Sequence, residues 1–277
     1  MKELVFDSEF FKAEDTLACG QVFRYAKKED GYFLVSGDKA CRLRECGKAT
    51  VLCCREEDEE YFKNYFDVYT DYRAIYARAK NSGFEFLSQA ADFGKGVRIL
   101  NQNSEEMLFS FMISQNNNIP RIKSIIEKLC AMCGEKRDFY GEKYYAFPSA
   151  KELETLTFAD LAAAGLGYRA EYVKGLCEAV KGGIVDQLKP LSAAECRARL
   201  LKIKGIGEKV ADCVSLFGFH KTDSFPADVW VERIYRENFN GTEKNRKKIS
   251  EYFVSKFGCD SGFFQQYMFY YKRSANR

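Results

Sequence analysis

The sequence predicts an α+β protein, with an antiparallel β-sheet domain over residues 1–95 followed by a larger α-helical domain over residues 96–277. Short aromatic and apolar runs with glycine-containing turns dominate the first part of the chain. From about residue 97 onward, apolar residues recur at helical spacing and the connections are short. A chain of 277 residues can bury a core in each of two such domains.

Three runs are expected to form the strands of the sheet. They are Gly31–Gly37, Lys39–Gly47 and Thr50–Arg55, and turns with Gly-Asp and Cys-Gly separate them. Such short connections favour antiparallel pairing. The aromatic-rich segment Glu59–Arg78 is expected to follow as helical.

The second domain is expected to consist of successive helices. Ser104 is a candidate cap for the first, in which Met107, Leu108, Phe111 and Met112 have the spacing of one helical face. The later helices are expected at Ile119–Cys130, Ala150–Thr155, Thr157–Ala164, Tyr168–Lys181, Ala193–Ile203, Lys209–Phe219, Val229–Asn238, Asn245–Phe257 and Gly262–Lys272.

Composition excludes several classes of protein. With 46% hydrophobic and 30% charged residues and a formal net charge of +3, the chain has ordinary globular composition. Its apolar runs are shorter than the ~20 residues of a membrane helix, so no membrane partner is expected. Basic residues do cluster beside a glycine-rich turn, which suits phosphate contact. They are Arg197, Arg199, Lys202, Lys204 and Lys209.

The eleven cysteines are expected to be reduced thiols, because the number is odd and the chain is not a small secreted one. Cys130 and Cys133 have the spacing of half a metal site, but no second pair completes it. His220 is the only histidine. No metal site is therefore expected.

The stretch Lys204–Gly207 reads KGIG and lies between two expected helices, which predicts a helix–hairpin–helix at residues 196–219. Gly205 and Gly207 allow a sharp turn. Amides at the start of the second helix lack helical partners and make an anion site. The same pattern is also that of an ordinary αα-hairpin, so the turn alone leaves DNA binding open.

Two charged residues stand at helix starts after this turn. Lys209 occupies the first turn of a helix, where the dipole disfavours a cation. Asp228 follows Pro226 and occupies the position of an N-cap, where backbone amides favour the ionised carboxylate. Asp228 could equally serve only as a cap, and Lys209 could point away.

The stretch GIGEKVADC, followed by FPADVW, resembles the helix–hairpin–helix DNA glycosylases with the Gly/Pro-Asp signature. Lys209 is similar to the lysine of the bifunctional branch. The resemblance implies that the neutral amine of Lys209 attacks the anomeric carbon and displaces the base, while Asp228 stabilises the positive character of the sugar. The Schiff base would then undergo β-elimination.

Four further stretches resemble the eukaryotic-type 8-oxoguanine DNA glycosylases: ACGQVFRY, SQNNNIPRI, GLGYRAEYV and GFFQQYMF. The resemblance implies that the enzyme flips 8-oxoguanine out of duplex DNA and contacts the orphaned cytosine. Asn116, Arg121 and Arg169 match the cytosine contacts, and Tyr168 matches the wedge that enters the stack.

Residues of the same motifs are expected to hold the flipped base. Phe269 could stack on the purine and Gln265, four residues earlier, could bond its Watson–Crick edge. Cys213 could cover the opposite face. Gly20 matches the residue whose carbonyl accepts the N7–H of the oxidised base, where guanine has an acceptor.

One departure concerns Trp230, which stands where many family members have histidine and cannot carry a proton. Together with Gly205 and Gly207 it is expected to contact DNA phosphate. The implied partner is duplex DNA with an oxidised purine, bound by a monomer. The implied location is the cytoplasm, associated with the nucleoid, in a bacterium and the nucleus in a eukaryote.

No cofactor is expected to be required, although the hairpin carbonyls could hold a structural monovalent cation. An iron–sulfur cluster is not expected, because only Cys213 and Cys259 follow Lys209. Two alternatives stay open: a lysine-bearing glycosylase for other oxidised bases, and a non-catalytic helix–hairpin–helix DNA-binding module.

Overall fold

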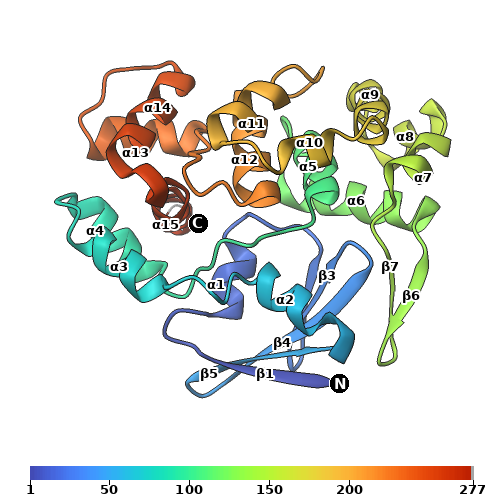
Figure 1. Ribbon diagram of the computed structural model, residues 1–277, viewed down its shortest axis with the longest axis horizontal. Coiled ribbons are helices and arrows are strands. Elements are labelled where there is room, and N and C mark those ends of the chain that lie inside the picture. Colours follow the sequence, from blue (N-terminus) through green and yellow to red (C-terminus); the bar gives the residue numbers. More distant parts are fainter. Residues whose placement is uncertain (276–277) are drawn as a thin grey trace.

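The computed structural model describes residues 1–275 and combines a five-stranded antiparallel sheet with a larger body of helices (Figure 1), which confirms the expected fold class. The strand order is β1-β5-β4-β3-β2. The three expected strands are confirmed as β3, β4 and β5, while both edge strands were missed. The strands are β1 (Lys2–Asp7), β2 (Tyr25–Lys28), β3 (Gly31–Ser36), β4 (Lys39–Cys46) and β5 (Ala49–Cys54).

Helices α1 (Ala13–Ala18) and α2 (Glu59–Tyr65) belong to the core that covers one face of the sheet. The segment expected to be helical over residues 59–78 forms two helices rather than one. Asp67 adopts a left-handed φ of 51°, and a separate helix, α3 (Tyr72–Lys80), begins after Asp71 caps it. A left-handed residue cannot continue a right-handed helix, so the chain turns there.

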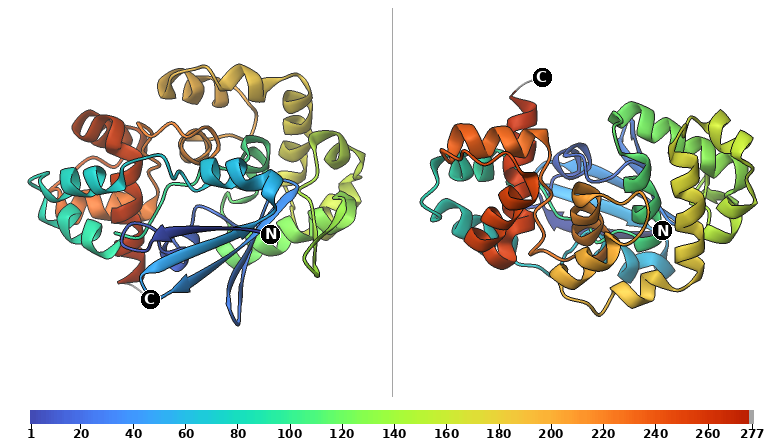
Figure 2. Two further views of the ribbon diagram at one scale, coloured as in Figure 1. Left: turned by 60° about the horizontal axis from the view of Figure 1, so that its bottom comes forward. Right: turned by 90° about the horizontal axis from the view of Figure 1, so that it is seen from above.

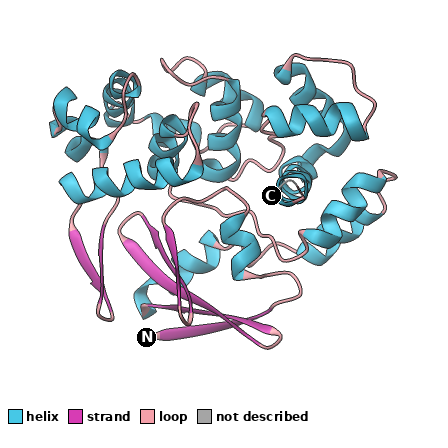
Figure 3. Cartoon of the chain, turned by 180° about the vertical axis from the view of Figure 1, so that it is seen from behind, coloured by secondary structure: helices cyan, strands magenta, loops and turns pink. Residues whose placement is uncertain are grey.

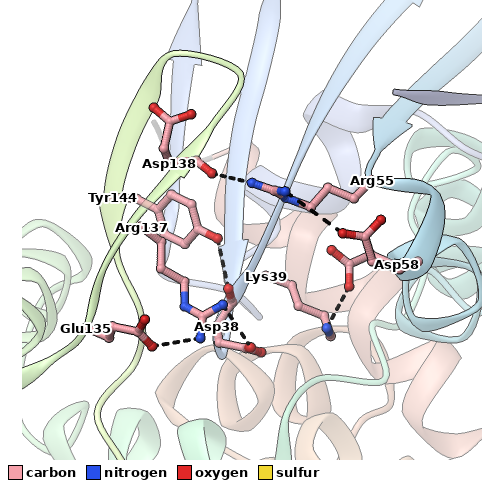
Figure 4. Close-up of polar contacts among 9 residues, drawn as sticks. Asp38, Lys39, Arg55, Asp58, Glu135, Arg137, Asp138 and Tyr144 are labelled. Atoms are coloured by element: carbon pink, nitrogen blue, oxygen red, sulfur yellow. Dashed lines mark hydrogen bonds and ion pairs between the residues drawn. The ribbon is translucent and has the colours of Figure 1, made fainter.

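A second hairpin, β6 (Lys136–Phe139) and β7 (Glu142–Tyr145), lies against the sheet near the turn between β3 and β4 and was not expected. The Phe139 ring centre lies 6.1 Å from that of Phe33. Around this contact, polar groups join the two sheets (Figure 4): the Tyr144 hydroxyl donates to the Asp38 carbonyl at 2.8 Å, and Arg55 donates to the Asp138 carbonyl at 2.6 Å.

The helices expected after residue 103 are confirmed, with ends that shift by a few residues. Ser104 is not the cap of the first, because Asn103 accepts the amide of Glu106. The remaining helices are α4 (Glu85–Phe93), α5 (Ser104–Ile113), α6 (Ile119–Cys133), α7 (Ala150–Thr155), α8 (Phe158–Ala164), α9 (Arg169–Lys181), α10 (Ile184–Leu188), α11 (Ala193–Leu200), α12 (Glu208–Phe219), α13 (Val229–Asn238), α14 (Arg246–Phe257) and α15 (Ser261–Ser274).

Helix α5 lies at the centre of the helical body, with every residue from Glu106 to Ile113 buried. Helices α9 and α12 pack against it, and α15 packs between α4 and α13 (Figures 1 and 2). Seen from behind, the strands lie on one side of the molecule and most of the helices on the other (Figure 3). Thus α3 and α4 join the helical core although they precede residue 96, and the domain boundary at that residue stays a prediction. Within residues 1–275, the helices are too short or too polar to cross a bilayer.

Candidate active site

The hairpin between α11 and α12 spans residues 201–207. Gly205 has a φ of +90°, and a Cβ atom there would lie 2.5 Å from the Tyr172 ring, so only glycine fits. Gly207 is exposed, and a Cβ atom on it would meet nothing within 4 Å. Helix α12 begins without a side-chain cap. Its first amides therefore face an open surface that a phosphate could approach.

Lys209 lies in the first turn of α12 and is half-buried. Its Nζ lies 5.4 Å from the centre of the Phe111 ring on α5. Phe111 in turn stacks on Phe217 at 5.7 Å and meets the edge of Phe23 at 5.6 Å. The amine of Lys209 thus lies over a cluster of aromatic rings that come from three separate segments of the chain.

Asp228 caps α13, which confirms the position expected for it. Its Oδ1 accepts the amides of Trp230 at 2.9 Å and Val231 at 3.1 Å. These two bonds fix the direction of the carboxylate at the positive end of the helix dipole. The carboxylate is half-buried, which keeps it accessible.

The thiol of Cys213 links these two residues. Burial raises the pKa of Cys213 to about 11, with the nearby Lys209 ammonium opposing the rise and the carboxylates of Asp212 and Asp228 adding to it. Lys209 and Cys213 lie one turn apart on α12, and the charges of Lys209 and of Asp228, from a different helix, both act on this buried thiol. The thiol stays protonated at neutral pH.

Gln265 and Phe269 lie one turn apart on α15, as expected. Gln265 is buried, and its Nε2 donates to the Pro226 carbonyl at 3.3 Å. Its Oε1 is buried without a partner among residues 1–275. Because a buried polar atom without a partner is costly, this oxygen marks a place where a donor is needed.

Gly20 lies opposite Phe269. It has a φ of +99°, and a Cβ atom on it would lie 3.5 Å from the Phe269 ring. The neighbouring carbonyls of Ala18 and Cys19 accept bonds from Arg273 and Gln266. Among the hydrogen bonds found within residues 1–275, none uses the Gly20 carbonyl. The Gly20 carbonyl is thus an acceptor without a partner in that part of the chain, on a residue whose Cβ position faces an aromatic ring.

The three residues expected to contact the opposite cytosine and the expected wedge, Tyr168, lie together. Asn116, with a left-handed φ of 46°, donates from Nδ2 to the Tyr168 hydroxyl at 3.4 Å. Tyr168 is 54% exposed, as a wedge requires. Arg121 is exposed and donates to the Gly165 carbonyl at 3.4 Å.

Arg169 differs from these three because it is buried. Its Nε donates to the Gln115 carbonyl at 2.9 Å, and its Nη2 donates to the Asn116 carbonyl at 3.1 Å. In this structure Arg169 holds the turn that carries Asn116. Its contact with cytosine stays a prediction.

The basic residues of the hairpin are partly engaged within the protein. Arg197 bonds Asp212 at 2.7 Å and also pairs with Glu208, and burial raises the pKa of Asp212 to about 6 against the effect of Arg197. Lys204 pairs with Glu171 at 2.5 Å. Because its guanidinium is paired with two carboxylates of the protein, Arg197 is poorly placed to bind a DNA phosphate.

Trp230 is half-buried at the start of α13, and the Arg233 guanidinium lies 5.0 Å from its ring centre. Sequence reasoning missed this neighbour, and it also missed Arg273 on α15. Arg273 follows Phe269 by four residues, so the helical spacing that linked Gln265 to Phe269 could have found it.

All eleven cysteines are free thiols, and no cluster of potential metal ligands occurs within residues 1–275. The cofactor expectations, including a monovalent cation at the hairpin, stay predictions.

Comparisons with known families and proteins point to one enzyme class. The family described as "8-oxoguanine DNA glycosylase, N-terminal domain" matches residues 3–108, and the "HhH-GPD superfamily base excision DNA repair protein" family matches residues 109–258. A probable N-glycosylase/DNA lyase of Methanothermobacter thermautotrophicus is 30% identical over 240 residues, which are 79% of this chain and 75% of the relative. The N-glycosylase/DNA lyase of Saccharomyces cerevisiae is 35% identical over 169 residues, 56% of this chain and 45% of that protein.

A solved structure is similar over the whole chain. It is the 8-oxoguanine glycosylase/lyase of Clostridium acetobutylicum in complex with double-stranded DNA containing cytosine opposite 8-oxoguanine. The identity is 35% and the TM-score is 0.92, with 100% of this chain and 99% of that chain covered.

Proposed function

Because the chain belongs to the HhH-GPD superfamily of base-excision DNA repair proteins, in its 8-oxoguanine DNA glycosylase branch, we propose that it is a bifunctional DNA glycosylase and lyase that removes 8-oxoguanine opposite cytosine. The observation that carries this proposal is that Lys209 at the start of α12 and Asp228 at the start of α13 both act electrostatically on the buried thiol of Cys213. A nucleophile and an anion close together are what glycosidic displacement with a lysine requires.

The reaction begins on the flipped nucleotide. The neutral amine of Lys209 attacks C1′ of the deoxyribose, the C1′–N9 bond breaks, and the base leaves with its electron pair and takes up a proton. The sugar carries positive character while the bond breaks, and the carboxylate of Asp228 stabilises it. Because Asp228 is held by two backbone amides, it needs no rearrangement during the step.

Ring opening then gives a Schiff base between Lys209 and C1′. A general base then removes a proton from C2′ of the sugar. The C3′–O bond breaks, and the DNA strand is cut on the 3′ side. Hydrolysis of the Schiff base restores the amine. Atoms and charge balance with one water consumed, and no step uses a metal ion.

The groups facing the base favour the oxidised purine. The N7–H of 8-oxoguanine can donate to the Gly20 carbonyl, whereas the N7 lone pair of guanine would repel it. The N1–H or N2–H groups can donate to the Oε1 of Gln265, which lacks a partner among residues 1–275. Phe269 and Cys213 would enclose the ring between them.

Duplex DNA is the macromolecular partner, and Gly205, Gly207 and Trp230 are its proposed phosphate contacts. Asn116, Arg121 and Arg169 would hold the cytosine while Tyr168 fills the gap in the stack. The enzyme would act as a monomer and without a cofactor. It would work at the nucleoid of a bacterium or in the nucleus of a eukaryote.

The test is base release and strand cleavage on a panel of duplexes. The panel contains 8-oxoguanine opposite each of the four bases, and an oxidised pyrimidine opposite guanine. We expect fastest release of 8-oxoguanine opposite cytosine, with cleavage on the 3′ side. Preferred release of the pyrimidine would instead support a glycosylase for other oxidised bases. Duplex binding without any base release would support a non-catalytic module.

A further inference from the structure

The residues proposed to recognise the base come from opposite ends of the chain. Gly20 lies in the turn after α1, and Phe269 lies on α15. The distance between the Gly20 carbonyl and the Phe269 ring must therefore be fixed by contacts between α15 and this turn. Glycine has no side chain of its own to hold its backbone in place.

Arg273 makes this connection. Its Nη2 donates to the carbonyl of Ala18, two residues before Gly20. Its guanidinium carbon lies 5.3 Å from the centre of the Phe269 ring. A Cβ atom on Gly20 would lie only 2.6 Å from its Nη1. One planar group thus contacts both sides of the proposed base slot.

The position of Arg273 follows from helical geometry. Gln265, Phe269 and Arg273 are each four residues apart on α15, so they form one stripe that faces the same way. Successive residues of this stripe lie about 6 Å apart along the helix axis. Gln265 is buried at its inner end and Arg273 is half-buried near the end of the helix, so Arg273 stands at the outer edge of the slot.

We propose that Arg273 is a positioning residue for base recognition, which sets the spacing between the Gly20 carbonyl and the Phe269 ring. This inference rests on the proposed function. Arginine suits the task because a planar guanidinium can stack on a ring and donate hydrogen bonds in its own plane at once. Lysine can supply the charge and one donor but not the planar contact. Alanine supplies neither.

The experiment compares two reactions of the same enzyme. Release of 8-oxoguanine opposite cytosine needs the base slot, whereas cleavage of a preformed abasic site needs Lys209 but no base. Both are measured under single-turnover conditions for the wild type, Arg273→Lys and Arg273→Ala, well below each unfolding midpoint. Lys272→Ala is the matched control, because Lys272 pairs with Glu237 at 2.7 Å.

We expect Arg273→Ala to release 8-oxoguanine about tenfold more slowly, the scale of losing one hydrogen bond from a charged group, with abasic-site cleavage unchanged. The rate of 8-oxoguanine release by Arg273→Lys should lie between those of the wild type and Arg273→Ala. Lys272→Ala should release 8-oxoguanine and cleave abasic sites at the wild-type rates. An unchanged ratio of the two reactions, an equal loss of both, or faster base release would each overturn the role of Arg273.

The wild-type measurement separates this inference from the proposed function. A wild type that cleaves abasic sites but releases no 8-oxoguanine contradicts the proposed substrate, and the inference fails with it. A wild type that releases 8-oxoguanine, together with an Arg273→Ala enzyme of unchanged ratio, contradicts the role of Arg273 alone.

Discussion

The side-chain amide of Gln265 donates a hydrogen bond to the backbone carbonyl of Pro226, 3.3 Å away. This bond joins α15, which carries the proposed base contacts, to the segment that leads into Asp228. The other end of the same side chain, Oε1, is buried without a partner within residues 1–275. The bond therefore orients an unused acceptor relative to the carboxylate that would stabilise the sugar.

Gln265→Ala should slow the release of 8-oxoguanine by about 10- to 100-fold, because the base loses a buried hydrogen bond of about 1–3 kcal/mol. Cleavage of a preformed abasic site should stay near the wild-type rate, since no base is present. Single-turnover assays on the two duplexes check this. Equal losses on both would show that Gln265 supports the fold of the site rather than base recognition.

Asp228→Asn should separate chemistry from structure. Asparagine caps helices about as well as aspartate, so Oδ1 can still accept the amides of Trp230 and Val231 and the unfolding midpoint should change little. The charge beside the sugar is lost, and base release should fall by roughly 10²- to 10³-fold. Duplex affinity, measured by fluorescence anisotropy, should be largely kept. Wild-type excision by this variant would remove the proposed role.

Arg121→Ala and Arg169→Ala should behave differently. Both should weaken the preference for cytosine opposite the lesion. Only Arg169→Ala should also destabilise the protein, by about 1–3 kcal/mol, because its buried guanidinium holds the Gln115 and Asn116 carbonyls. Excision rates against each opposite base, with thermal unfolding of both variants, check this. Unchanged opposite-base ratios would argue against cytosine contact.

Stability should depend on pH through Glu106. This buried carboxyl accepts the Gly37 amide at 2.6 Å, and burial raises its pKa to about 7, with the neighbouring Arg24 and that amide opposing the rise. Between its usual value and about 7, the folded state holds a proton that the unfolded state has released. The free energy of unfolding should therefore fall as pH rises through this window, by about 3 kcal/mol at most.

Glu106→Gln cannot ionise and should flatten this dependence. Urea unfolding at pH 5.5 and pH 8 measures the slope for both proteins. The remaining slope should include Asp212, whose pKa is raised to about 6. Identical slopes in the wild type and Glu106→Gln would exclude Glu106 as the source.

The elements that the sequence predicted well carry local signals. Helices α7 and α13 begin and end where expected, and their caps, Ser149 and Asp228, are visible in the sequence. The elements that were missed depend on distant contacts. The β6–β7 hairpin is held by Phe33 and by the turn at Asp38, which lie far away in the chain.

The same distinction applies to the site. Spacing on one helix was enough to place Gln265 with Phe269, and a cap signal was enough to place Asp228. The sequence could not reveal that Arg169 points into the protein, because the direction of this side chain depends on the carbonyls of another segment. Nor could it place Arg273 against Gly20, since the contact joins α15 to the turn after α1.

The most direct test of the whole account is borohydride trapping on a duplex with 8-oxoguanine opposite cytosine. The account predicts a covalent protein–DNA adduct for the wild type, attached at Lys209 when mapped by peptide mass, and no adduct or strand cleavage for Lys209→Gln. Lys204→Gln, which changes an exposed lysine paired with Glu171, should trap as the wild type does. Trapping by Lys209→Gln at the wild-type level would contradict the account.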